Sequence, residues 1–165
     1  MKKGNLIQAA QSSNTKQQTP NPKRQTLNGK QKTENRKHMK RIIKTSKAPA
    51  PIGPYNQAVL SGNMLYTSGQ IAINPETNEL ETEDLERETT LVMENLKAIL
   101  TEAGMTFENV IKTSIFISDM NNFSRINEVY GKYFDPETAP ARETVEVANL
   151  PKFVNVEISA IAVKG

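Results

Sequence analysis

The sequence predicts an α+β domain in which a single β-sheet carries two helices packed on one face. Segments with strand and helix patterns follow in the order β-β-α-β-α-β-β, with a short additional strand as an option in front. No apolar stretch approaches the roughly 20 residues of a membrane span, and 165 residues suffice for one domain with a tail. The face without helices needs another subunit if it carries apolar or active groups.

Charge divides the chain into two parts. Residues 1–47 hold 13 of the 21 lysines and arginines and one acid, so their net charge is +12. Residues 48–165 hold 8 basic and 17 acidic residues, so their net charge is −9. Residues 1–38 contain too few apolar side chains to build a core. We therefore expect a disordered basic extension over residues 1–38 and a folded domain over residues 39–165.

Three roles remain open for the extension. It can be an inert segment ahead of Met39, a polyanion-binding arm, or a targeting segment. Without aromatic residues to stack on bases, polyanion binding would be weak and salt-sensitive. Its apolar stretch is too short for a secretory signal, and the chain has no cysteine, which favours a cytoplasmic protein.

The domain begins with a strand, a loop and a hairpin. Lys40 to Lys44 can open a strand, and Ala48 to Tyr55 contains three prolines that stiffen a loop and can hold Tyr55 in one place. Two further strands, Ala58 to Leu60 and Met64 to Ile73, are separated by a Ser-Gly-Asn turn. Ser68 and Gly69 interrupt the second of these strands, as glycines do where a strand bulges or another group approaches closely.

Two helices and a strand follow. Thr82 to Ala103 has an apolar stripe at helical spacing, with Thr82 as the expected N-cap and Gly104 as the stop. Val110 to Ser118 is a β-branched strand expected to be mostly buried. A second helix is predicted from Asn121 or Asn122 to Phe134, with its aromatic residues in the core.

The last two strands carry the candidate chemistry. Arg142 to Ala148 places Arg142 on one face, where a planar guanidinium can hold a carboxylate by two parallel hydrogen bonds. Val154 to Val163 alternates so that Glu157 points away from the apolar face. From periodicity alone, Arg142 and Glu157 could also form a salt bridge or simply be solvated.

The residue inventory excludes several mechanisms. The chain has no cysteine, and its one histidine is His38 in the extension. A Ser-His-Asp triad, a multi-histidine zinc site and thiol chemistry are therefore excluded, and no phosphate-binding glycine motif is present. Proton transfer has to use carboxylates, tyrosine, lysine, main-chain groups or water.

Several short motifs follow one another along the domain: Ala50-Pro51-Ile52-Gly53-Pro54-Tyr55, Gly62-Asn63-Met64, Thr67-Ser68-Gly69-Gln70, Val110-Ile111-Lys112-Thr113, Pro140-Ala141-Arg142, Val145-Glu146-Val147-Ala148, Leu150-Pro151, Val156-Glu157-Ile158 and Ala160-Ile161-Ala162-Val163. In these motifs the sequence resembles the RidA (YjgF/L-PSP) family, and the resemblance covers about residues 40–165. The resemblance implies a chorismate-mutase-like fold with a mixed sheet. It also implies a homotrimer whose sheets form a central barrel, with active sites between subunits.

The resemblance further implies an activity without cofactor or metal: hydrolysis of 2-iminobutanoate and 2-iminopropanoate, the imine form of 2-aminoacrylate, to 2-oxo acids and ammonia. These intermediates come from pyridoxal-phosphate dehydratases. The family's functional residues correspond here to Arg142, which would bind the substrate carboxylate, and to Glu157, which would position or activate water. Tyr55, Ser68 and Gly69 would complete the site, with Tyr55 closing it and the other two binding substrate.

Two departures from the family pattern follow the arginine. Glu143 stands where the family often has serine, and Thr144 stands where some members have cysteine. Alternation should point Glu143 away from Arg142. Two other functions compete: a small-carboxylate-binding regulatory module without turnover, and an RNA-directed endoribonuclease or translation inhibitor. The charge of −9 in residues 48–165 argues against the latter.

Overall fold

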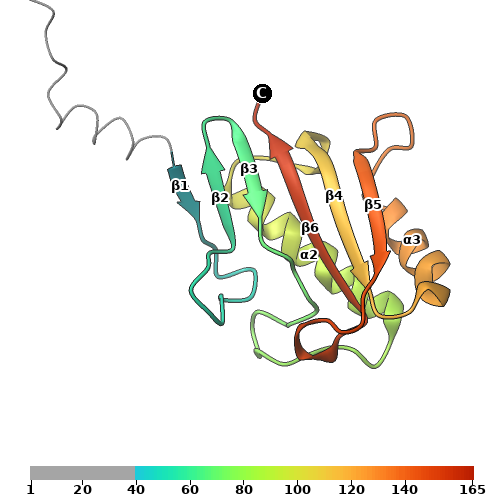
Figure 1. Ribbon diagram of the computed structural model, residues 1–165. Helices are drawn as coiled ribbons and strands as arrows, with labels where there is room; N and C mark the ends of the chain where they lie inside the picture. The colour runs from blue at the N-terminus through green and yellow to red at the C-terminus, as the bar shows by residue number, and fades with distance from the viewer. Residues whose placement is uncertain (1–39) are drawn as a thin grey trace, which may run out of the picture.

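The computed structural model describes residues 40–165 (Figure 1). The predictions made for residues 1–38, and Met39 as the start of the domain, lie outside the described residues. The described strands are β1 (Lys40–Ile43), β2 (Ala58–Ser61), β3 (Met64–Thr67), β4 (Val110–Ile117), β5 (Ala141–Glu146) and β6 (Val156–Val163). The described helices are α2 (Leu85–Glu102) and α3 (Phe123–Gly131), with short 3-10 turns at Phe107–Asn109, Met120–Asn122 and Pro151–Phe153.

The six described strands form one mixed sheet in the order β1-β2-β3-β6-β4-β5. The β4–β5 pair is parallel, and the other neighbours are antiparallel. The α+β prediction is therefore confirmed, including the strand in front of the first hairpin. The sheet places β6 at its centre, between the hairpin strand β3 and the long strand β4.

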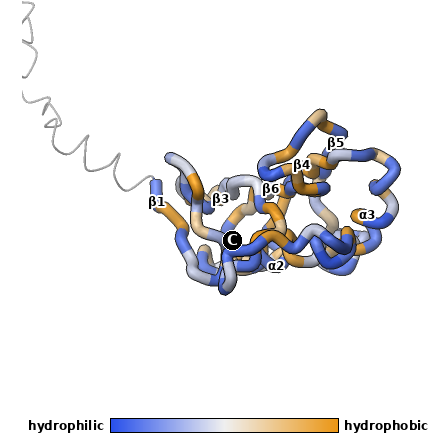
Figure 2. Tube along the Cα trace, turned by 90° about the horizontal axis from the view of Figure 1, so that it is seen from below, coloured by the Kyte–Doolittle hydropathy of each residue, from blue (hydrophilic) through white to orange (hydrophobic). Residues whose placement is uncertain are grey.

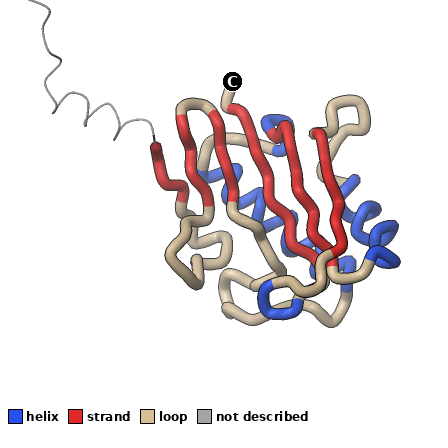
Figure 3. Tube along the Cα trace, in the orientation of Figure 1, coloured by secondary structure: helices blue, strands red, loops and turns tan. Residues whose placement is uncertain are grey.

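Helices α2 and α3 lie on the same face of the sheet (Figures 1 and 3). Strand β6 turns Val156, Ile158, Ala160 and Ala162 toward them, and all four are buried. Hydrophobic residues recur along β4 and β6 in Figure 2, as expected for strands covered on one side. Neither helix in this part of the chain has the length and apolar character of a membrane span.

The opposite face of the sheet is open. It carries large apolar side chains that are exposed: Ile42 is 43% exposed, Tyr66 46% and Val145 43%. The strand register joins two of them, because Ile42 and Tyr66 both pair with Val59. Within residues 40–165, the prediction that one face of the sheet would lack a cover is confirmed.

Several predicted boundaries differ from the observed ones: β5 ends at Glu146 and not at Ala148, and β6 begins at Val156 and not at Val154. The strand expected to reach Ile73 ends at Thr67, because the hydroxyl of Thr67, and not a main-chain group, accepts the Ala160 N–H at 2.8 Å. Helix α2 is capped by Asp84, which accepts the Arg87 N–H at 2.8 Å, and not by Thr82. Helix α3 begins after a 3-10 turn capped by Asp119 and ends at Gly131.

Candidate functional site

A cavity of about 470 Å³ opens between the proline loop and the edge where β3 ends. Four of the five predicted site residues line it: Tyr55, Ser68, Gly69 and Glu157. The remaining lining residues are mostly apolar or tied to their neighbours, namely Pro49, Ala50, Pro51, Ile52, Gln57, Gln70, Ile71, Ile73 and Pro151. Three segments that are distant in sequence therefore build one concave site.

The proline loop is fixed by a buried glutamine. Gln57 is 2% exposed, and its amide oxygen accepts the Thr45 N–H at 2.7 Å. Its amide nitrogen donates to the carbonyls of Thr45, Ala48 and Pro49 at 2.9, 3.0 and 2.9 Å. Tyr55 lies at the end of this loop, with its own N–H donating to the carbonyl of Gly53 at 2.8 Å.

The opposite wall is the segment that follows β3. The Ser68 N–H donates to the Gln57 carbonyl at 2.9 Å, and the Ser68 hydroxyl donates to the Asn56 carbonyl at 2.7 Å. Gln70 then pairs with Ile158 of β6 through two main-chain hydrogen bonds of 2.8 and 3.1 Å. These bonds hold the intervening Gly69 against β6.

Glu157 extends from β6 on the open face, opposite Phe116 of β4. Its side chain lies directly over Gly69. A Cβ atom at position 69 would be 2.6 Å from the Cδ of Glu157 and 2.8 Å from its Cγ, closer than real Cβ contacts. Only glycine leaves room for the carboxylate in this position, which explains the glycine predicted to interrupt the strand.

No hydrogen bond or ion pair within residues 40–165 engages the Glu157 carboxylate, although its side chain is half-buried beside Ile71 and Ile73. Burial raises the pKa of Glu157 above its ordinary value because the charged form loses solvation. A carboxylate that is partly dehydrated and free of internal partners can accept a hydrogen bond, or a proton, from water or from a ligand in the cavity.

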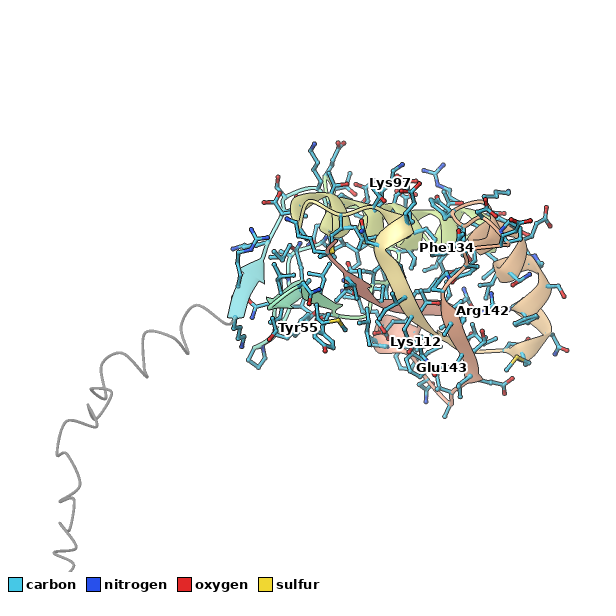
Figure 4. All side chains as sticks on the ribbon, turned by 90° about the horizontal axis from the view of Figure 1, so that it is seen from above. Tyr55, Lys97, Lys112, Phe134, Arg142 and Glu143 are labelled. Atoms are coloured by element: carbon cyan, nitrogen blue, oxygen red, sulfur yellow. The ribbon has the colours of Figure 1, made fainter. Side chains whose placement is uncertain are left out.

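Arg142 lies elsewhere. On β5 it pairs with Thr113 of β4, and this register turns it toward the helices. It lines a separate hollow of about 370 Å³ beside α3. One of its terminal nitrogens donates to the Asn127 amide oxygen at 2.7 Å. Its guanidinium carbon is 4.9 Å from the centre of the Tyr130 ring. Figure 4 shows Tyr55 and Arg142 at distant places in the molecule.

A single copy of the chain therefore does not bring the predicted site together. Glu157 and Arg142 extend from opposite faces of the sheet, and the salt bridge considered from periodicity does not form between them. A guanidinium that donates to a neutral amide and stacks on a ring keeps its charge and its remaining N–H groups for an anion.

The residues that hold the others in place were not predicted from the sequence. Asn127 and Tyr130 contact Arg142, and Gln57 anchors the proline loop. Phe123, Asn127 and Tyr130 are spaced to share one helix face, which was the available signal. The contact with Arg142 depends on the parallel β4–β5 register, which spacing does not reveal. In residues 40–165 no group of three or more acidic or histidine side chains is arranged to hold a metal ion.

Comparison with known proteins shows the family to which this chain is related. Residues 45–164 match the family model described as Endoribonuclease L-PSP. A RutC family protein of Synechocystis is 52% identical over 124 residues, which are 74% of this chain and 95% of that protein. The chain belongs to the RidA (YjgF/L-PSP) family.

RidA-family relatives whose names suggest an activity have similar sequence identity to this chain. TdcF of Escherichia coli K12, which carries the provisional name of reactive intermediate deaminase, is 48% identical over 76% of this chain and 98% of its own length. The crystal structure of Escherichia coli TdcF with bound serine aligns with a TM-score of 0.71 and 47% identity, over 76% of this chain and 99% of that one. RidA from an Antarctic Psychrobacter aligns with a TM-score of 0.72 and 42% identity, over 75% and 99%.

The two departures from the RidA pattern are accommodated differently. Glu143 points to the open face, away from Arg142 as expected, and accepts hydrogen bonds from Lys112 and Ser114. The bond from Lys112, and then that from Ser114, lowers the pKa of Glu143. The hydroxyl oxygen of Thr144 is buried and has no hydrogen-bond partner among the described residues.

Proposed function

We propose that this RidA-family chain hydrolyses 2-imino acids to 2-oxo acids and ammonia. The expected substrates are 2-iminobutanoate and 2-iminopropanoate, the imine tautomer of 2-aminoacrylate, released by pyridoxal-phosphate dehydratases. The single observation that carries the proposal is the Glu157 carboxylate, half-buried and without an internal partner over Gly69 in a cavity. The provisional name of TdcF and the serine bound in its structure support a small amino-acid-like ligand.

Hydrolysis of an imine requires few catalytic groups. The carbon of the C=N bond is already electrophilic, so Glu157 needs only to orient a water molecule and accept its proton as the oxygen adds. The raised pKa of Glu157 suits this role because it makes the carboxylate a stronger base. Once the imine nitrogen is protonated, addition of water with transfer of one proton to Glu157 gives a neutral carbinolamine. Glu157 returns that proton to the amino group and then accepts the proton of the hydroxyl group as the C–N bond breaks, which leaves a C=O bond and releases ammonia. Tyr55 would close the cavity over the substrate.

Arg142 would supply the remaining contact from a neighbouring copy. It would bind the substrate carboxylate through two parallel hydrogen bonds and so fix the reacting carbon near the water held by Glu157. The exposed apolar side chains Ile42, Tyr66 and Val145 on the open face favour association of copies through the sheet. We propose a homotrimer whose sheets form a central barrel, with each site between two subunits.

The test couples the purified full-length chain to a threonine dehydratase and measures the imine by semicarbazide trapping. We expect faster imine loss and therefore less trapped product when the chain is added. Arg142→Ala should lower kcat/KM by about 10- to 100-fold, because one charge-assisted contact with the substrate is lost. No acceleration by the wild-type chain, or full acceleration by Arg142→Ala, would contradict the proposal.

Two alternative functions are outcomes of related assays. Binding of 2-oxobutanoate without acceleration would favour a regulatory module that holds a small carboxylate. RNA cleavage is favoured by the description of the family model and weakly by the basic extension, while residues 48–165 carry 17 acidic against 8 basic residues and no histidine. Comparing RNA digestion by the full chain and by a chain lacking residues 1–38 would distinguish binding by the extension from an activity of the domain.

A further inference from the structure

The amide of Gln57 is wholly used in holding one wall of the cavity. Its oxygen accepts one main-chain N–H, from Thr45, and its nitrogen lies within 2.9 to 3.0 Å of three main-chain carbonyls in residues 45–49. A side chain that is 2% exposed and fully engaged with main-chain groups of a loop fixes that loop rather than offering groups to a ligand.

Few other hydrogen bonds stabilise the conformation of the proline loop. Pro49, Pro51 and Pro54 have no N–H to donate. The hydrogen bonds inside the loop are those from Lys47 to the Thr45 hydroxyl at 3.3 Å, from Ile52 to the Tyr55 hydroxyl at 3.3 Å, and from Tyr55 to Gly53 at 2.8 Å. None of them ties the loop to the sheet, so the Gln57 amide is its main polar anchor.

The main chain of the same residue holds the opposite wall. The Gln57 carbonyl accepts the Ser68 N–H at 2.9 Å, and Ser68 directly precedes the glycine beneath Glu157. Through its side chain Gln57 fixes the segment that leads to Tyr55, and through its carbonyl it fixes the segment that supports Glu157. One residue thus connects the two sides of the cavity.

We propose that Gln57 is a positioning residue that sets Tyr55 relative to the Glu157 carboxylate and thereby controls turnover. It acts through the loop, since its amide groups are engaged by main-chain partners and are not free for the substrate. The inference about turnover rests on the proposed hydrolase function. Since the substrate carboxylate would be bound by Arg142 of another copy, loss of the Gln57 amide should lower kcat while leaving KM nearly unchanged.

The test compares the wild-type chain with Gln57→Met, which keeps the length of the side chain but removes its hydrogen bonds to the loop. We expect kcat to fall by roughly tenfold or more at a temperature well below unfolding, with KM within about twofold. Amide hydrogen exchange should become faster in residues 45–55 and unchanged in α2. The control is Ile99→Val, a change in the buried face of α2 that should lower Tm and leave both kinetic constants as they are.

Loop exchange and kcat test the positioning role of Gln57 and the hydrolase function separately. Unchanged loop exchange in Gln57→Met, or faster exchange with an unchanged kcat, would overturn the positioning role. If the wild-type chain does not accelerate imine loss, the hydrolase proposal fails, and loop exchange alone decides whether Gln57 fixes the wall. If Gln57→Met does not fold, Gln57→Glu serves instead. It keeps an acceptor for the Thr45 N–H but removes the donor to the carbonyls of Thr45, Ala48 and Pro49, so exchange should become faster in the non-proline residues of 46–55 while Thr45 stays protected.

Discussion

Within residues 40–165, Glu157 is the one acid that is partly buried and yet has neither a cation nor a hydrogen-bond donor as a partner. Other partly buried acids are paired, as Glu86 is with Arg125 and Glu81 with Arg87. A half-buried carboxylate left without a partner destabilises the folded chain, since its charge is desolvated without compensation. Such a cost is typical of groups retained for binding or catalysis.

Thermal unfolding can detect the destabilisation caused by the Glu157 charge. Because burial raises the pKa of Glu157, the folded chain binds the proton more tightly than the unfolded chain, and stability decreases as pH rises through the interval between the two pKa values. Glu157→Gln should therefore raise Tm at neutral pH, and the gain should disappear at about pH 3.5, below the ordinary pKa of a glutamate.

The comparison is best made in an Arg142→Ala background, where no guanidinium from a neighbouring copy offsets the effect of burial. Glu76→Gln, in an exposed turn, is the matched control for the change of carboxylate to amide. A Tm difference between Glu157→Gln and its parent that stays constant from neutral to acidic pH would contradict the assignment.

At the scale of elements, the segment between β3 and the bridge to β6 gives the cavity its shape. The hydrogen bonds of β3 to β6 stop at Thr67, resume at Gln70, and leave Gly69 facing the Glu157 side chain. A continuous strand here would fill this space with a side chain. The break in the strand is therefore the feature that makes a carboxylate available on an otherwise regular sheet.

Gly69→Ala should act on the carboxylate and not on the fold. The added methyl group would be 2.6 Å from the Glu157 Cδ, so the flexible glutamate side chain has to rotate away. We expect kcat to fall by roughly tenfold or more, since the water would be misplaced, with Tm little changed. The trapping assay and thermal unfolding measure the two effects.

Gly53→Ala is the matched control, because its methyl group would meet the Tyr55 ring at 3.4 Å, an ordinary van der Waals contact. Equal losses of kcat in Gly53→Ala and Gly69→Ala would indicate that any added methyl group near the cavity is harmful. In that case the position of Glu157 over Gly69 would not be the cause.

At the scale of the whole molecule, the two candidate groups are divided between the two faces of one sheet. Arg142 is turned to the helix side by its pairing with Thr113, and Glu157 is turned to the open side by its pairing with Phe116. No rotation of a side chain carries a group through a sheet. A site that uses both groups requires a second copy of the chain, which is the reason for the proposed trimer.

Mixing two impaired variants tests this arrangement. Arg142→Ala and Glu157→Gln chains, each strongly impaired alone, should form fully active sites when they are co-expressed, because one chain supplies the arginine and the other the glutamate. Random assembly into a cyclic trimer should restore about a quarter of the sites. Light scattering measures the oligomeric state of the same samples, and mixed trimers without any recovered activity would contradict a site shared between copies.

The sequence by itself determined the α+β class, the order of the elements and the membership of Glu157 in a strand with its side chain away from the core. These properties depend on local periodicity, which the chain carries in the spacing of its apolar residues. It also indicated Gly69 as a point of close approach, since glycine inside a strand pattern is itself a local signal.

Only the tertiary structure decided which residues meet. That Asp84 and not Thr82 caps α2, that the strand ends at Thr67, and that Gln57 anchors the proline loop all depend on hydrogen bonds made after the chain folds. The separation of Arg142 from Glu157 depends on the parallel β4–β5 register, a pairing between distant segments. Spacing along a strand shows which side chains of that strand share a face. Pairing with other strands decides whether that face is the helix-covered or the open face of the sheet.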